Sequence, residues 1–243
     1  MLKYIDMHCH LPDCAECCLA PDFNAITACV YNAAHISDWE KIIRCTNTYP
    51  GRVFGAIGIH PWDIDNLPAD WEWRICDMLA RHRDLMLGEI GIDKTHPGLP
   101  AQAEIFSRQL QIAAKYNRPV QIHCTGAWNI LTDALKSYNA AAPIILHAYS
   151  GSADLMDVLI RKHNAYISFS PSVLNARHIR ARRCAAIAPL SRILVESDAR
   201  PGADIGRTVD AIAQIRGITA SRAAAAIYNN SMGIIKNGYS KQD

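Results

Sequence analysis

A pair of histidines near the start of the chain is the first feature that could do chemistry. His8 and His10 end the apolar segment 2–10, which we predict to be a strand. Because alternate side chains of a strand point to opposite faces, the two imidazoles share one face and Cys9 lies on the other. Two imidazoles at one strand end can bind a divalent metal ion, but a lone His-x-His pair is weak evidence for one. The metal hypothesis therefore depends on further ligands elsewhere in the chain.

More ionisable residues stand at the ends of later apolar segments. They are His60, Glu89, His123, His147 and Asp198. Glu89 lies inside the apolar run 88–92, where a buried carboxylate is costly unless a cation or hydrogen bonds compensate it, and glycines on either side allow close approach. In the structural alternatives, Glu89 pairs with an arginine and each histidine is a hydrogen-bonded core residue. Glu196, two residues before Asp198, competes with it for the same role.

The candidate metal ligands are His8, His10, Glu89, His123, His147 and Asp198. One catalytic zinc with an open position does not need so many ligands, so we predict two divalent ions with Glu89 as the bridge. Imidazole and carboxylate donors suit zinc, manganese, magnesium or iron, and the sequence does not select among them.

The elements that position these residues are short apolar strands alternating with longer segments of helical spacing. We predict strands at 2–10, 25–31, 52–59, 85–92, 119–123, 143–147, 164–170 and 192–196, and helices at 37–46, 69–81, 101–116, 127–138, 153–163, 175–187, 208–216 and 219–235. Strands that are apolar on both faces and alternate with helices indicate a parallel sheet, and eight such units indicate a closed (β/α)8 barrel of the TIM type. An open doubly wound sheet usually has a glycine-rich loop after its first strand, where this chain has His-Cys-His-Leu-Pro. We therefore expect one α/β domain over residues 1–243.

Composition limits the class of protein more than the function. Hydrophobic residues make up 50% of the 243, no apolar stretch reaches the length of a membrane span, and no signal-peptide pattern opens the chain. We expect a cytoplasmic monomer that does not bind membranes, with its nine cysteines as free thiols. The Cys14–Cys17 pair has the spacing of a metal or redox motif but no second pair, so we interpret it as a loop feature. The net charge of +2 excludes no class of partner.

The motifs taken together resemble the TatD family of metal-dependent hydrolases, which have amidohydrolase-like barrels. The matching segments, in family order, are 6–10, 58–61, 88–93, 119–123, 147–151 and 196–199, with Gln102, Phe106, Gln109 and Leu110 between them.

The resemblance implies that His8, His10, Glu89 and Asp198 bind one ion and that Glu89, His123 and His147 bind the other. It also implies hydrolysis of phosphodiester bonds in DNA from a strand end, in the 3′ to 5′ direction, with two magnesium, manganese or zinc ions as cofactors. Asp198 would accept the proton of a water whose pKa the metal lowers, and Glu89 would share the catalytic centre. His60 would contact the substrate phosphate; alternatively, it is a structural residue that holds the turn at 60–61.

Several positions differ from the family pattern on the substrate side. The arginine expected soon after His123 is absent, and Lys94-Thr95-His96 replaces an aromatic pair. Ser197 stands for the commoner threonine, Arg200 precedes Pro201, and the segment 229–232 lacks an arginine. All six candidate metal ligands are nevertheless present, so the resemblance supports a hydrolase more firmly than it supports a DNase.

A basic run at 177–183 could bind a nucleic-acid backbone in place of the missing arginine, with Arg180 and Arg182 as substrate contacts. The alternative is an ordinary solvated helix face. Trp62 and Trp128 are the candidates for base stacking, although packing explains Trp128 equally well.

The primary prediction is a 3′ to 5′ DNA exonuclease or related phosphodiesterase that acts on single strands or strand ends. The alternative is a small-molecule or aminoacyl-RNA ester or amide hydrolase that uses the same two-metal site. A steep loss of binding with salt would favour the nucleic-acid substrate. A non-catalytic scaffold would be expected to lack some ligands, and none is missing.

Overall fold

The computed structural model describes residues 2–12 and 21–238. Its centre is a sheet of eight parallel strands that pair in chain order from β1 to β8. The strands are β1 (Ile5–Cys9), β2 (Ala28–Asn32), β3 (Val53–Ile57), β4 (Met86–Asp93), β5 (Val120–Thr125), β6 (Ile144–Leu146), β7 (Ala165–Phe169) and β8 (Ile193–Val195). This order confirms the predicted (β/α)8 barrel. The motif Cys14–Cys17 lies outside the described residues.

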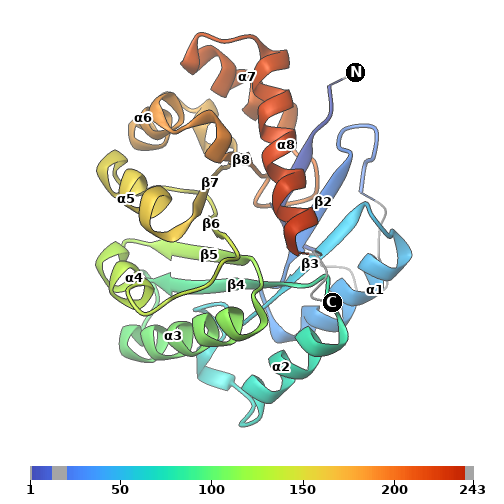
Figure 1. Ribbon diagram of the computed structural model, residues 1–243, viewed down its shortest axis with the longest axis vertical. Coiled ribbons are helices and arrows are strands. Elements are labelled where there is room, and N and C mark those ends of the chain that lie inside the picture. The colour runs from blue at the N-terminus through green and yellow to red at the C-terminus, as the bar shows by residue number, and fades with distance from the viewer. Residues whose placement is uncertain (1, 13–20, 239–243) are drawn as a thin grey trace.

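Helices surround the sheet in chain order, from α1 and α2 through the green to orange α3–α6 to the red α7 (Figure 1). They are α1 (Trp39–Thr48), α2 (Trp71–Arg81), α3 (Leu99–Tyr116), α4 (Trp128–Leu135), α5 (Ala153–His163), α6 (Ile179–Ile187), α7 (Ile205–Arg216) and α8 (Ala220–Gly238), with short 3-10 helices η1 (Ile36–Asp38), η2 (Ile64–Asn66), η3 (Pro171–Leu174) and η4 (Leu190–Arg192). The helix predicted from residue 175 begins four residues later, because a bend and a turn after η3 occupy residues 175–177. In the described ranges, no helix has both the length and the apolar character needed to cross a bilayer.

Apolar side chains pack on both faces of the sheet, as the strand sequences predict. The outer cluster lies between strands and helices and includes Leu87 and Ile122. The inner cluster fills the barrel and includes Met7 and Val30, together with Ile234 of α8. Asn230 of α8 donates to the carbonyl oxygens of Leu190 and Ile193, just before and at the start of β8, so α8 covers the amino-terminal end of the barrel. The opposite end, where the strands finish, is left to polar residues.

The barrel closes between β1 and β8 through main-chain hydrogen bonds at its carboxyl-terminal edge. The Asp198 amide donates to the His8 carbonyl oxygen at 3.0 Å, and the His10 amide donates to the Ala199 carbonyl oxygen at 2.9 Å. Closure therefore brings three candidate ligands together, although their segments lie nearly the whole chain apart.

Two strands lose regular pairing where they carry ionisable residues. The register shifts between residues 6 and 9 in β1 and between residues 87 and 90 in β4. In β1, Met7 faces the barrel interior, and the irregularity lets His8 turn toward the same interior. In β4, residues 87 and 90 both face outward, which leaves Glu89 to face inward. These local irregularities thus aim two candidate ligands at the barrel axis.

Candidate metal centre

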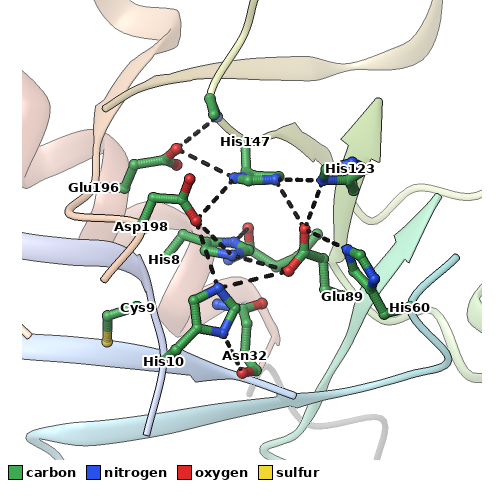
Figure 2. A network of polar contacts seen from close by, with 12 residues as sticks. His8, Cys9, His10, Asn32, His60, Glu89, His123, His147, Glu196 and Asp198 are labelled. Carbon is green, nitrogen blue, oxygen red and sulfur yellow. Dashed lines mark hydrogen bonds and ion pairs between the residues drawn. The ribbon is translucent and has the colours of Figure 1, made fainter. Parts of the chain in front are cut away.

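Seven ionisable side chains gather at the carboxyl-terminal end of the barrel, with Glu89 among them (Figure 2). They come from β1, β4 and β5 or from the residues that follow β1, β3, β6 and β8: His8, His10, His60, Glu89, His123, His147 and Asp198. The structure therefore brings together all six predicted metal ligands, with His60 beside them. Figure 2 also shows Cys9 pointing away from the cluster, as strand alternation predicts.

The two carboxylate oxygens of Glu89 face different histidines. Glu89 Oε2 lies 3.3 Å from His8 Nε2 and 3.7 Å from His10 Nε2. Glu89 Oε1 lies 3.0 Å from His123 Nδ1 and 2.8 Å from His147 Nε2. A carboxylate with one oxygen in each of two ligand groups has the arrangement that a bridge between two cations requires.

The close approach of β4 and β5 depends on a glycine. A Cβ at Gly91 would lie 1.9 Å from the carbonyl oxygen of His123, so no other residue fits at this position without moving the strands. This confirms the expectation that the glycines beside Glu89 permit close approach.

Asp198 completes the group around His8 and His10. Its Oδ1 lies 3.5 Å from His10 Nε2 and 3.9 Å from His8 Nε2. The side chain is 38% exposed, so it borders both the cluster and solvent.

The loop that carries Asp198 is fixed by a buried carboxylate. Asp6 accepts hydrogen bonds from the amides of Ser197, at 2.9 Å, and Gly202, at 2.8 Å, one on each side of Asp198. Asp198 itself has a left-handed backbone conformation with φ of 52°. Burial raises the pKa of Asp6 to about 7, although these amide bonds oppose the rise.

Glu196, the competitor of Asp198, has a different position. Its side chain is fully buried, and its Oε1 accepts a hydrogen bond from the Ala148 amide at 2.5 Å. The same oxygen lies 3.4 Å from His147 Nδ1, on the side of the imidazole away from Glu89. Glu196 thus stands behind a candidate ligand, whereas Asp198 faces the cluster.

Oxygen atoms behind His8 and His10 assign the protons of both rings. His8 Nδ1 lies 3.4 Å from the amide oxygen of Gln121, whose Nε2 donates to the Met7 carbonyl at 2.7 Å. His10 Nδ1 lies 3.1 Å from the carbonyl oxygen of Asn32. Because these oxygens only accept, Nδ1 carries the single proton of each neutral ring, and in that form the Nε2 lone pair faces the centre.

His123 and His147 also have oxygen atoms behind the outer ring nitrogen and direct the other nitrogen toward the centre. His123 Nε2 lies 3.3 Å from Asp93 Oδ2, so in the neutral ring the proton is on Nε2 and the Nδ1 lone pair faces Glu89. Behind His147, Glu196 Oε1 lies 3.4 Å and Asp198 Oδ1 lies 3.9 Å from Nδ1, both as ion-pair contacts without hydrogen-bond geometry. The two inward nitrogens, His123 Nδ1 and His147 Nε2, are 3.1 Å apart. Two lone pairs at this distance repel each other unless a proton or a cation lies between or beside them.

His60 has the opposite polarity. Its Nδ1 accepts a hydrogen bond from the Trp62 amide at 3.2 Å, so the proton of the neutral ring is on Nε2. Nε2 points into the cluster, 3.5 Å from Glu89 Oε1. Burial lowers the pKa of His60, which favours this neutral form. His60 therefore holds its turn and also presents a donor to the centre.

The electrostatics of the cluster favour a bound cation. Burial raises the pKa of Glu89, but the neighbouring His147 and His8 and the hydrogen bonds of the imidazoles outweigh this effect and hold the pKa well below its usual value. Burial lowers the pKa of His147, but Glu89 and Glu196 outweigh it and hold the pKa well above the usual value. A buried ionised carboxylate thus depends on positive charge that protonated imidazole supplies in the absence of metal.

The donor set fits divalent ions. His8 Nε2 is buried and has no hydrogen-bond partner, although its lone pair points into the cluster. The possible ligand atoms come within reach of one another in three groups: His8, His10 and Asp198; His8, Glu89 and His147; and His60, Glu89 and His123. In the third group, His60 presents Nε2–H and no lone pair in its neutral form. Nitrogen and carboxylate oxygen donors of this kind suit zinc, manganese, magnesium or iron.

Several contributors behind the candidate ligands were not identified from the sequence. They are Gln121, Asp93 and Asp6. Gln121 has a sequence signal, because it precedes His123 by two residues and so shares its strand face. Asp93 and Asp6 belong to the quoted motifs, but their partners lie far away along the chain.

The predicted substrate contacts Arg180 and Arg182 lie at the start of α6, which follows η3 on the carboxyl side of β7. Arg180 is exposed, whereas Arg182 is half-buried and donates to the Val173 carbonyl at 2.6 Å. Trp128 packs against Tyr149, with ring centroids 5.0 Å apart, which supports the packing explanation for this residue. The substrate role of both arginines stays a prediction.

The sequence family that matches the chain is described as TatD related DNase, over residues 5–236. The chain therefore belongs to this family of barrel metallohydrolases, which confirms the resemblance seen in its motifs. Human deoxyribonuclease TATDN3 is 24% identical, covering 94% of this chain and 93% of the relative. The 3′-5′ ssDNA/RNA exonuclease TatD of Escherichia coli K12 is 25% identical, covering 74% of each chain.

The fold comparison agrees with the family match. The crystal structure of YJJV, a TatD homologue from Escherichia coli K12, superposes with a TM-score of 0.84 and 20% identity, covering 95% of this chain and 97% of that chain. At this identity the likeness concerns the barrel fold, and the chemistry has to be argued from the side chains.

Proposed function

We propose that the chain is a two-metal nuclease that hydrolyses phosphodiester bonds in single-stranded nucleic acid or at strand ends, in the 3′ to 5′ direction. The observation that carries the proposal is the split of the Glu89 oxygens between two histidine groups. His8, His10, Glu89 and Asp198 would bind one ion, and Glu89, His123 and His147 the other.

Divalent ions in this site would supply positive charge to the phosphoryl oxygens and lower the pKa of water. The chain itself supplies the proton acceptor. Burial raises the pKa of Asp198, but its hydrogen bond with His10 and the charges of His147 and His8 outweigh this and lower it. Asp198 is therefore ionised near neutral pH and, being 38% exposed, can accept a proton from an attacking water.

His60 is the proposed contact of the substrate phosphate. Because its Nδ1 accepts from a main-chain amide, its Nε2–H is available to an anionic oxygen in the centre. A donor of this kind stabilises charge that develops on a phosphoryl oxygen. Arg180, exposed at the start of α6, would add a screened attraction for the nucleic-acid backbone.

The names of the relatives support nucleic acid as the substrate, and they include both DNA and RNA. The choice among magnesium, manganese and zinc, the monomeric state and the cytoplasmic location stay predictions from the sequence. The alternative small-molecule or aminoacyl-RNA ester or amide hydrolase would use the same ligands.

The test is hydrolysis of a labelled single-stranded oligonucleotide by chelator-treated protein, with magnesium, manganese or zinc restored one at a time. The label is placed at the 5′ end so that removal of 3′ nucleotides gives a ladder of shortened products. Metal-dependent shortening that Asp198→Asn protein lacks is the expected result. An intact oligonucleotide together with metal-dependent cleavage of a small ester would instead favour the alternative.

A further inference from the structure

Trp62 stands at the edge of the metal centre, and the residue is 51% exposed. It follows His60 by two residues, and the two rings are 4.8 Å apart between centroids. The Trp62 and His123 centroids are 6.4 Å apart. A large aromatic ring is thus half open to solvent beside two histidines of the centre, where packing alone would favour full burial.

Two contacts of the indole and one of the main chain hold Trp62 in place. Its Nε1–H donates to Asp93 Oδ2 at 2.8 Å, and its main-chain amide donates to His60 Nδ1 at 3.2 Å. His96 stacks on the indole with centroids 5.0 Å apart and planes 20° from parallel. Because the ring is already fixed, little side-chain entropy remains to be lost when a ligand stacks on its exposed part.

Asp93 connects this ring to the metal centre. The oxygen that accepts from Trp62 also lies 3.3 Å from His123 Nε2, so one carboxylate orients both the indole and a candidate ligand. Lys94, the next residue, is exposed and adds a positive charge on the same rim. The surroundings of Trp62 therefore offer a flat aromatic surface and a cation next to the proposed position of a phosphate.

We propose that Trp62, supported by His96, is a stacking platform for an unpaired base of the nucleotide that flanks the scissile phosphate. Aromatic side chains bind successive bases of single strands in this way, with little dependence on sequence. A paired base within a duplex has both faces covered by its neighbours, so the platform selects single strands and frayed ends. This inference rests on the proposed nuclease function.

The test compares two substrates and three variants. One single-stranded oligonucleotide has normal 3′-terminal nucleotides, and the other has abasic residues at its last two positions. The variants are Trp62→Ala, Trp62→Phe and the control Trp73→Ala; Trp73 is 65% exposed on α2 and has no part in the centre. KM and kcat are measured for each, and binding is measured by fluorescence anisotropy in proteins that also carry Asp198→Asn.

Loss of one stacked base is worth about 1–3 kcal/mol, or about 5- to 140-fold in affinity. Trp62→Ala should therefore raise KM and the dissociation constant of the normal oligonucleotide by about this factor, whereas Trp62→Phe should retain most of the binding and Trp73→Ala all of it. The abasic oligonucleotide should bind the wild-type protein as weakly as the normal one binds Trp62→Ala.

The decisive comparison is the abasic oligonucleotide with Trp62→Ala. No further loss should occur there, because neither partner of the stack is present. Equal losses on normal and abasic substrates would overturn the inference and make Trp62 a structural support of Asp93. If the wild-type protein cleaves the normal oligonucleotide and Trp62→Ala has the same KM and dissociation constant, the stacking proposal is wrong while the proposed nuclease function stands. If the wild-type protein neither cleaves nor binds either oligonucleotide, both fail.

Discussion

Replacing Glu89 by glutamine tests the bridge between the two proposed metal sites. The amide has nearly the same shape as the carboxylate but no charge and only one oxygen, so it cannot serve His8 on one side and His147 on the other as a carboxylate does. The barrel should remain folded without metal, because Glu89 helps to raise the pKa of His147, and this imidazole loses its proton more readily when the negative charge is removed. Metal binding and hydrolysis should both be lost.

The expected change in stability follows from the linkage between metal binding and folding. A metal present at 100 times its dissociation constant stabilises the folded state by about 2.7 kcal/mol for each site, which corresponds to about 5–11 °C in Tm for a chain of this length. Loss of even a residue behind a ligand costs about 10- to 100-fold in affinity. A 100-fold loss leaves about 0.4 kcal/mol per site, or about 1–2 °C.

The assay is thermal unfolding followed by circular dichroism, with chelator or with added manganese, together with calorimetric titration of the number of bound ions. Glu104→Gln is the matched control, because Glu104 lies on α3 with 70% of its side chain exposed. The wild-type protein and the control should show the full metal-dependent rise in Tm. A Glu89→Gln protein that kept this rise and both ions would refute the bridging role. A variant that failed to fold in chelator would refute the claim that Glu89 serves metal binding more than stability.

Three further outcomes follow from the contacts. Asp198→Asn should abolish hydrolysis but retain oligonucleotide binding, as gel and anisotropy assays would measure; retained turnover would exclude Asp198 as the base. Arg182→Ala should lower the free energy of unfolding in urea by about 1.5–3 kcal/mol through the lost bond to Val173, whereas Arg180→Ala should leave stability unchanged and raise KM only at low salt. Asp6→Asn should cost about 1–3 kcal/mol and reduce kcat, because one of two loop amides loses its acceptor; unchanged kcat would show that the Asp198 loop does not need this support.

The barrel and the identity of the candidate ligands could be predicted from the sequence because both depend on local patterns. Buried strands are short apolar runs, and polar residues at their ends mark the rim. The direction in which the ligand side chains point, into or out of the barrel, could not be predicted in the same way. Regular alternation from Met7 would turn His8 outward, and only the irregular pairing of β1 allows both to face the barrel interior. Such irregularities depend on neighbouring strands that the local sequence does not contain.

The sequence also could not decide whether Glu196 or Asp198 faces the metal centre, for a similar reason. Spacing by two residues gives both the same strand face, but β8 ends at Val195 and the chain then turns through a left-handed residue. Glu196 consequently stays buried behind His147, and Asp198 reaches the open side of the centre. The turn depends on Asp6, which is almost the full length of the chain away, so no local pattern could have separated the two carboxylates.

The contacts behind the histidines also separate their chemical roles. His8, His10, His123 and His147 each have an oxygen behind the outer nitrogen and aim a lone pair inward, which is what a cation needs.

His60 alone among these rings has an amide donor behind it and aims a proton inward, which is what an anionic oxygen needs. Asp93 connects one of these histidines, His123, to Trp62 at the rim of the centre. Burial raises its pKa, but hydrogen bonds from Thr95 and Trp62 outweigh the rise and lower the pKa to about 2, so the carboxylate stays ionised. It can then hold the proton of His123 and the indole of Trp62 together, which makes the orientation of a candidate ligand and of the proposed base platform depend on one side chain.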